Sequence, residues 1–126
     1  MADDSFAAAI NCMDGRVQLP VIEYMKNRFG VDHVDKITEA GPIKLLAENN
    51  NPEKIESIRH RVEISVVKHG SKIVAIVGHD DCAGNPVEKE IQKKQISKSI
   101  DLARGWGFDA EYLGLFVNAK WEVEEI

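Results

Sequence analysis

Residues 73–82 have the sequence Ile-Val-Ala-Ile-Val-Gly-His-Asp-Asp-Cys, in which a β-branched apolar run passes directly into a polar loop. A continuous apolar run of this kind is typical of a central parallel strand that is covered on both faces. A second segment is built in the same way, because residues 6–10 are apolar and Cys12-Met13-Asp14-Gly15-Arg16 follows closely. In an open α/β sheet, ligands bind in the crevice beyond the carboxyl ends of the strands. The two segments therefore predict a sheet with reactive side chains at the ends of two strands.

The rest of the chain alternates between strand and helix patterns. We expect strands at residues 5–11, 31–38, 72–78, 112–117 and 121–126. Helices are expected at 19–29, from the loop at 39–42 to about 48, at 52–69 and at 85–104. Strands that alternate with helices imply right-handed crossovers and a parallel sheet. The sequence thus predicts a three-layer α/β fold in one domain, residues 1–126. Its mainly parallel four-stranded sheet should have the order 2-1-3-4, plus a short edge strand, so that the loops after strands one and three open a crevice.

Two of the expected helices carry apolar stripes, which mark the face that a helix buries. The stripe of the helix at 52–69 consists of Ile55, Ile58, Val62 and Val66, widened by Ile64 and Val67. The stripe of the helix at 85–104 consists of Val87, Ile91, Ile96, Ile100 and Ala103. Near the C-terminus, we expect Trp121 to pack in the core or at a contact between subunits.

The composition is that of an ordinary soluble globular protein, with 44% hydrophobic and 29% charged residues among 126. The net charge of −5 argues against a nucleic-acid-binding surface. No apolar run reaches the roughly 18 residues that a membrane span needs. The acidic start at residues 1–4 does not resemble a signal peptide. We therefore expect a cytoplasmic protein, in which two cysteines are more often ligands, nucleophiles or core residues than a disulfide.

Cys12, His79 and Cys82 combine two thiols with one imidazole, a ligand set that suits zinc. The spacing His79-x-x-Cys82 lets one tight turn supply two ligands to the same ion. Three protein ligands leave one position open, which is the pattern of catalytic zinc sites. Water at that position would have a pKa near 7, so hydroxide would be available at neutral pH. Two alternatives stay open: the cysteines could be plain core residues, or they could form a redox pair.

Asp14 and Arg16 lie close enough to Cys12 to act on the same site. If the backbone is extended there, both side chains point to the same side. A guanidinium binds a carboxylate through two parallel hydrogen bonds. Arg16 could therefore hold Asp14 away from the metal and leave the fourth position to water, while Asp14 serves as a gate or proton acceptor. The alternative is a simple surface ion pair.

The pattern Cys-x-Asp-x-Arg followed by His-x-x-Cys resembles the β-class carbonic anhydrases, and the chain is similar in size to their short prokaryotic or putative members. Glu39-Ala40-Gly41 stands where that family has an Asn-Ala-Gly loop, and Asp81 matches an acidic residue often found before the second Cys. The resemblance implies one zinc per chain on Cys12, His79 and Cys82, and a catalytic Asp14–Arg16 dyad. It also implies reversible hydration of carbon dioxide to bicarbonate by zinc-bound hydroxide, in a homodimer or homotetramer.

The chain departs from the family pattern around the open position. Gly15 replaces the usual serine, Ala83 separates Cys82 from Gly84, and Glu39 replaces the asparagine. These changes leave the ligands and the dyad in place but alter the pocket. Two other functions therefore remain: hydrolysis of carbon disulfide or carbonyl sulfide, or a non-catalytic zinc-binding or regulatory homo-oligomer on the same scaffold.

Overall fold

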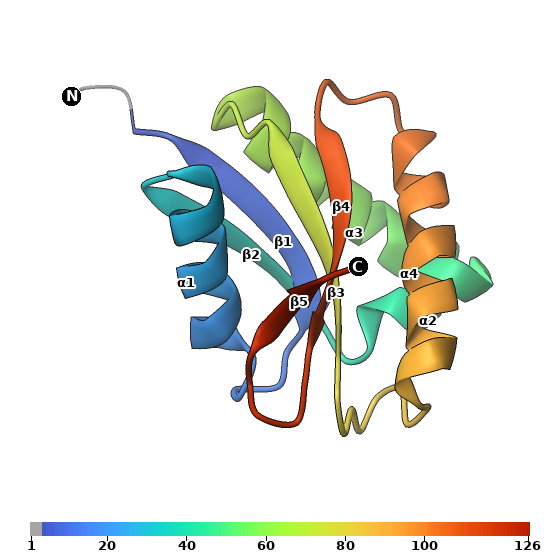
Figure 1. Ribbon diagram of the computed structural model, residues 1–126. Helices are drawn as coiled ribbons and strands as arrows, with labels where there is room; N and C mark the ends of the chain where they lie inside the picture. The colour runs from blue at the N-terminus through green and yellow to red at the C-terminus, as the bar shows by residue number, and fades with distance from the viewer. Residues whose placement is uncertain (1–3) are drawn as a thin grey trace.

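The computed structural model describes residues 4–126, and Figure 1 shows the course of the chain. Its strands are β1 (Phe6–Cys12), β2 (His33–Glu39), β3 (Ile73–His79), β4 (Glu111–Val117) and β5 (Val123–Glu125). Its α-helices are α1 (Gln18–Phe29), α2 (Pro42–Glu48), α3 (Pro52–Glu63) and α4 (Lys89–Arg104), and a short π-helix, η1 (Ile64–Lys68), continues α3. Residues 1–3, which contributed to the exclusion of a signal peptide, lie outside the described part. Within that part, the structure contains no helix with both the length and the apolarity needed to cross a membrane.

The five strands form one sheet in the order β2-β1-β3-β4-β5. The first four are parallel to their neighbours, and β5 runs antiparallel to β4. Ile10 of β1 lies beside Ile37 of β2 and Ile76 of β3, so the first and third strands are direct neighbours. The predicted α/β class and strand order are confirmed.

The sheet is covered on both faces, with α1 on one side and α2, α3 and α4 on the other (Figure 1). Alternate residues of β1 serve the two cores: Ala7 and Ala9 pack toward Val21 and Met25 of α1, whereas Ala8 and Ile10 belong to the cluster around α2, α3 and α4. The alanine-rich run is a strand because both of its faces are completely buried.

The long helix before the π-helix is shorter than the sequence predicted. Ile55, Ile58, Val62 and Val66 are buried as expected. Ile64 and Val67, however, are 40% and 61% exposed. The reason is their position on the helix: at the regular α period, Ile64 and Val67 point away from the face that Ile55, Ile58 and Val62 define. Ser65 is buried in that segment instead.

The expected start of α4 at residue 85 was wrong, because the helix begins at Lys89. Val87 therefore precedes the helix, and Ile91 is 42% exposed. The inward face of α4 consists of Gln92, Ile96, Ser99 and Ala103. Of its two polar side chains, Ser99 donates to the Ile43 carbonyl of α2, whereas Gln92 contacts the end of β3 and leads to the candidate site.

Candidate metal centre

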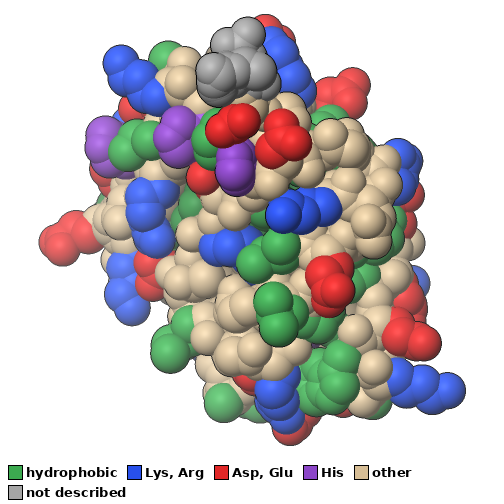
Figure 2. Space-filling view, turned by 90° about the vertical axis from the view of Figure 1, so that its left-hand side faces the viewer, with side chains coloured by type: hydrophobic (Ala, Val, Ile, Leu, Met, Phe, Trp, Pro, Cys, Tyr) green, Lys and Arg blue, Asp and Glu red, His purple; other side chains and the backbone are tan. Residues whose placement is uncertain are grey.

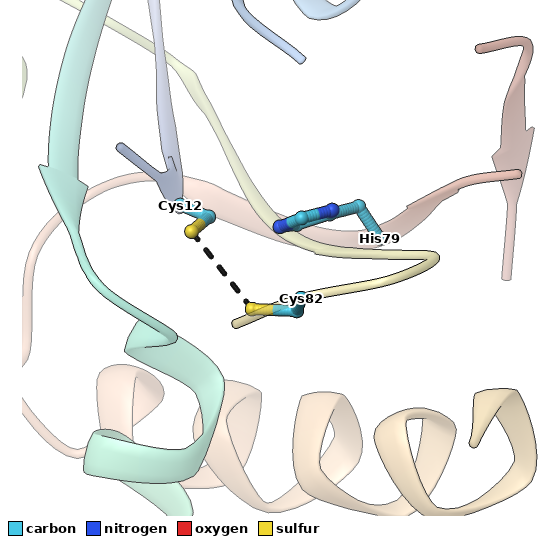
Figure 3. A group of neighbouring side chains, drawn as sticks. All are labelled: Cys12, His79 and Cys82. Carbon is cyan, nitrogen blue, oxygen red and sulfur yellow. Dashed lines mark hydrogen bonds between the residues drawn. The ribbon is translucent and has the colours of Figure 1, made fainter. Parts of the chain in front are cut away.

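The strand ends bring three candidate ligands together. Cys12 is the last residue of β1, His79 is the last residue of the neighbouring β3, and Cys82 follows in the turn after β3. One ligand atom of each lies within 4.8 Å of the others. All three side chains are buried, and the Sγ atoms of the two cysteines are 3.9 Å apart (Figure 3). The structure therefore places the three predicted residues in one cluster although 70 positions separate the two cysteines.

The imidazole of His79 is oriented as a metal ligand would be. Its Nδ1 lies 2.8 Å from the carbonyl oxygen of Asp80. Because a carbonyl can only accept a hydrogen bond, Nδ1 carries the proton and Nε2 has a free lone pair. Nε2 is buried and has no hydrogen-bond partner among residues 4–126, and the ring points toward the cysteines (Figure 3). A metal-bound histidine commonly donates its other ring N–H to a carbonyl. The unpartnered nitrogen beside two thiols fits a zinc ion.

Gln92 fixes the backbone of His79. Its Oε1 accepts from the His79 N–H at 3.0 Å, and its Nε2 donates to the His79 carbonyl at 2.8 Å. This contact requires glycine at position 78, since a Cβ there would lie 2.6 Å from Gln92 Oε1. A side chain of α4 thus completes the hydrogen bonding of the strand end that carries the ligand.

The surroundings of the Cys82 thiol favour its neutral form. Burial, followed by the nearby Cys12, raises the pKa of the Cys82 thiol to about 11. Zinc binds thiolates, so binding must release protons. Both cysteines are free thiols.

Asp14 and Arg16 form the predicted ion pair, but the backbone between them has a different conformation from the expected one. The backbone is not extended here: Val17 N–H donates to the Asp14 carbonyl in a turn. The Arg16 N–H donates to Asp14 Oδ1 at 2.9 Å, its Nη2 donates to Oδ2 at 2.7 Å, and its Nε contacts both oxygens. The Arg16 side chain and then its backbone N–H lower the pKa of Asp14 to about 2. The side-chain hydrogen bond to Asp14 raises the pKa of Arg16.

Gln18 closes this turn from the other side. Its Nε2 donates to the carbonyls of Cys12 and Asp14, each at 2.8 Å. Its Oε1 accepts from Asn11 Nδ2 at 3.1 Å and from Lys36 Nζ at 3.0 Å. The sequence offered no signal for this role, because Gln18 resembles any polar residue at the start of a helix.

Arg16 also links the two motifs. Its Nη1 lies 3.3 Å from Asp81 Oδ2, and its Nη2 donates to the Asp81 carbonyl at 3.1 Å. The Trp121 ring covers the guanidinium, 4.7 Å from its centre. Trp121 also packs partly against the core beside α1, which agrees with the expected core packing.

A cavity of about 220 Å³ opens beside the ligands and is lined by Cys12, Met13, Asp14, Ala40, Ala83 and Gly84. Apart from the Asp14 carboxylate and the Cys12 thiol, these side chains are apolar or absent. Glu39 is not among the residues that line this cavity. Its carboxylate accepts a hydrogen bond from Arg61 at 2.6 Å instead. The cavity therefore offers a small, mostly apolar space next to a gate-like carboxylate.

Comparisons with known proteins agree with this arrangement. A family model described as "Putative carbonic anhydrase" matches residues 2–126. A search of curated sequences found no significant match.

Several solved structures share the fold. For β-carbonic anhydrase isoform I of the protozoan Trichomonas vaginalis, the sequence identity is 17%, the TM-score is 0.58, and the match covers 94% of this chain and 81% of that one. For the β-carbonic anhydrase CafA of the fungus Aspergillus fumigatus, the corresponding values are 14%, 0.51, 98% and 76%. For the β-carbonic anhydrase CcaA they are 13%, 0.56, 97% and 80%. Because the family model spans almost the whole sequence, the chain belongs to the putative carbonic anhydrase family, and its fold is that of the β-carbonic anhydrases.

Proposed function

We propose that this protein catalyses the reversible hydration of carbon dioxide to bicarbonate with one zinc ion per chain, held by Cys12, His79 and Cys82. The observation that carries the proposal is the His79 Nε2 atom, which is buried without a partner in residues 4–126 and clustered with two thiols. A buried polar atom without a partner is costly, and a metal would satisfy it. Zinc at this site would supply a Lewis acid that brings the pKa of water at its open position to about 7.

The residues around the site suit an open fourth position. Both carboxylate oxygens of Asp14 are engaged by Arg16, so Asp14 would have to leave Arg16 before it could bind the metal. With a pKa of about 2, Asp14 is ionised at neutral pH and can accept a hydrogen bond. The same low pKa means that Asp14 does not retain a proton. The proton that hydration releases therefore passes on to buffer. Arg16 is thus the residue that orients the acceptor.

The cavity suits a small linear molecule of low polarity. Met13, Ala40 and Ala83 supply apolar contacts, and Gly84 adds no side chain. Carbon disulfide and carbonyl sulfide share this linear shape, so hydrolysis of one of them is the second candidate. The third candidate is a zinc-binding regulatory protein without turnover. Such a protein would not need Arg16 to hold the Asp14 carboxylate.

The test is stopped-flow carbon dioxide hydration near pH 8.5 on protein with one zinc per chain. Asp14→Ala should keep its zinc and lose turnover, because the hydrogen-bond acceptor at the open position is gone. Asp80→Ala is the matched control, since Asp80 is an exposed carboxylate of the second motif, and it should retain activity. Turnover of carbon disulfide or carbonyl sulfide alone would favour the second candidate. Full zinc occupancy without turnover of any of the three would contradict both enzymatic candidates.

We also propose a homodimer or homotetramer. β2 lies at one edge of the sheet, where unpaired backbone groups invite further pairing. Met13, Leu19 and Val67 are each more than 60% exposed. Figure 2 shows hydrophobic side chains scattered among charged ones on the side where α1 and β2 lie. The cytoplasmic location expected from the sequence stays a prediction.

A further inference from the structure

Two unusual backbone conformations meet at the side chain of Arg16. In residues 4–126, the non-glycine residues with positive φ are Asn49 at 50°, Asp81 at 57° and Trp121 at 61°. Such conformations are unfavourable for residues with a side chain and concentrate at functional sites. Asn49 ends α2, where this conformation is common. The other two, Asp81 and Trp121, both contact Arg16.

These contacts hold a side chain that burial alone does not fix. The Arg16 side chain is 46% exposed, yet it is engaged from three directions. Asp14 accepts from its Nε and Nη2, the carbonyl of Asp81 accepts from Nη2, and the Trp121 ring covers the guanidinium. An indole face attracts a cation, and tryptophan does so best among the aromatic residues.

The turn between β4 and β5 holds Trp121 in place. The Trp121 N–H donates to the Asn118 carbonyl at 2.9 Å. The Asn118 Oδ1 accepts from the backbone N–H groups of Lys120 at 2.9 Å and Glu122 at 3.1 Å. The side chain is partly buried beside the α1 core. The unfavourable φ of Trp121 is therefore stabilised by its surroundings, and its ring has a defined position.

We propose that Trp121 and Asp81 form a clamp that positions Arg16, and that Arg16 thereby keeps the Asp14 carboxylate away from the metal position. Trp121 is a positioning residue in this account, because it acts through Arg16. The purpose of the clamp rests on the proposed function, whereas its effect on Arg16 does not need a metal.

The first test measures hydrogen exchange of the Arg16 Nε–H by ¹⁵N NMR in the reduced, metal-free full chain, with the resonance assigned from Arg16→Lys. In Trp121→Gly the exchange should be about two- to fivefold faster, the range expected for loss of an exposed cation–π contact. Glycine accepts positive φ without strain, so the change removes the ring and not the backbone conformation. Trp121→Phe retains a ring and should restore most of the protection.

Asn49→Gly is the matched control, since it relieves the same kind of backbone conformation away from Arg16 and should leave the exchange unchanged. Asp81→Gly is the second clamp variant. This change removes the contact between the Asp81 carboxylate and Arg16 Nη1, and glycine tolerates the positive φ at this position. Exchange of the Arg16 Nε–H should again be faster. Unchanged Arg16 exchange in both Trp121→Gly and Asp81→Gly would overturn the clamp.

The second test uses cobalt(II) in place of zinc, with thiocyanate as the probe of the open position and the visible spectrum as the readout. If the clamp is lost, the Asp14 carboxylate is free to compete with thiocyanate for the open position. Trp121→Gly should therefore bind thiocyanate more weakly than the parent and Asn49→Gly do. Equal affinity would overturn the link between the clamp and the open position. Absence of carbon dioxide hydration together with faster Arg16 exchange would refute the proposed function and leave the clamp in place.

Discussion

At the scale of single residues, His79 depends on a partner that the sequence did not reveal. Gln92 bonds both the N–H and the carbonyl of His79. Gln92→Met keeps the size of the side chain but leaves two buried backbone groups without partners. Each such group costs about 1–3 kcal/mol, so the free energy of unfolding should fall by about 2–6 kcal/mol. Loss of a residue that supports a metal ligand also typically weakens metal binding about 10- to 100-fold.

Urea unfolding and competitive zinc titration measure these two effects. Lys94→Met is the control, because Lys94 is an exposed residue of the same helix and should change stability by no more than about 0.5 kcal/mol. A Gln92→Met protein as stable as this control would show that the Gln92 contacts do not support His79.

Residue type and spacing predicted the cluster of candidate ligands and the Asp14–Arg16 ion pair, but not the residues that hold them. Cysteine, histidine and paired charges are recognisable because their chemistry is specific to a site. Gln18, Gln92 and Trp121 act through contacts made only in the folded chain. Glutamine on a helix is usually solvent-facing, so the apolar stripe of α4 was assigned to Ile91 and not to Gln92. Nothing in the sequence indicated that Trp121 would lie over Arg16.

At the scale of elements, the two loops of the crevice meet by close backbone contact. A Cβ at Gly84 would lie 2.8 Å from the Ala40 carbonyl carbon and 2.9 Å from the Gly41 nitrogen. Gly84→Ala should therefore push the loop after β2 away from the loop after β3. Overpacking of this kind costs about 1–3 kcal/mol.

Gly15→Ala provides the matched comparison in the first motif. A Cβ at Gly15 would meet nothing within 4 Å, so this variant should unfold within about 0.5 kcal/mol of the parent. Thermal or urea unfolding of both variants tests the contrast. Equal stability of the two variants would argue against a tight contact between the loops.

The elements themselves followed from apolar patterns, whereas two helix boundaries did not. β3 and β1 were predicted because uninterrupted apolar runs suit buried parallel strands. Asn85 and Pro86 resemble a helix start, but Asn85 is buried and bonds Gln95 from the loop, which delays α4 to Lys89. The π-helix at Ile64–Lys68 had no signal in the sequence, and Ile64 and Val67 were wrongly added to a stripe that even the regular α period does not give them.

At the scale of the whole molecule, Lys36 should leave a signature in the pH dependence of stability. Burial lowers the pKa of Lys36 from 10.5 to about 8. Between these values the unfolded chain binds more protons than the folded chain, so Lys36 makes the free energy of unfolding rise with pH. Below about pH 8 the lysine is charged in both states, and the folded state bears the cost of burying that charge.

Lys36→Met should remove this rise. After allowance for solvent screening, the difference between variant and parent should change by about 1–2 kcal/mol from pH 7.5 to 10.5. Urea unfolding at a series of pH values measures it, with the exposed Lys26→Met as control. If Lys36→Met and Lys26→Met show the same pH dependence, the charge of Lys36 is not buried.

The proposed assembly is tested by light scattering at micromolar concentration. The mass should be at least twice the 14.1 kDa of the chain, because an assembly would cover the unpaired β2 edge or the exposed apolar side chains. A mass of one chain would contradict the proposed homo-oligomer.

The central claim is that the ends of β1 and β3 form a zinc site that acts on carbon dioxide. The most direct measurement is the rate of carbon dioxide hydration as zinc is titrated into reduced, metal-free protein. The account predicts a rate that rises in proportion to bound zinc, levels off at one zinc per chain, and is absent in Cys82→Ser. A rate that stays at the buffer background with one zinc bound per chain, or that does not depend on zinc, would contradict it.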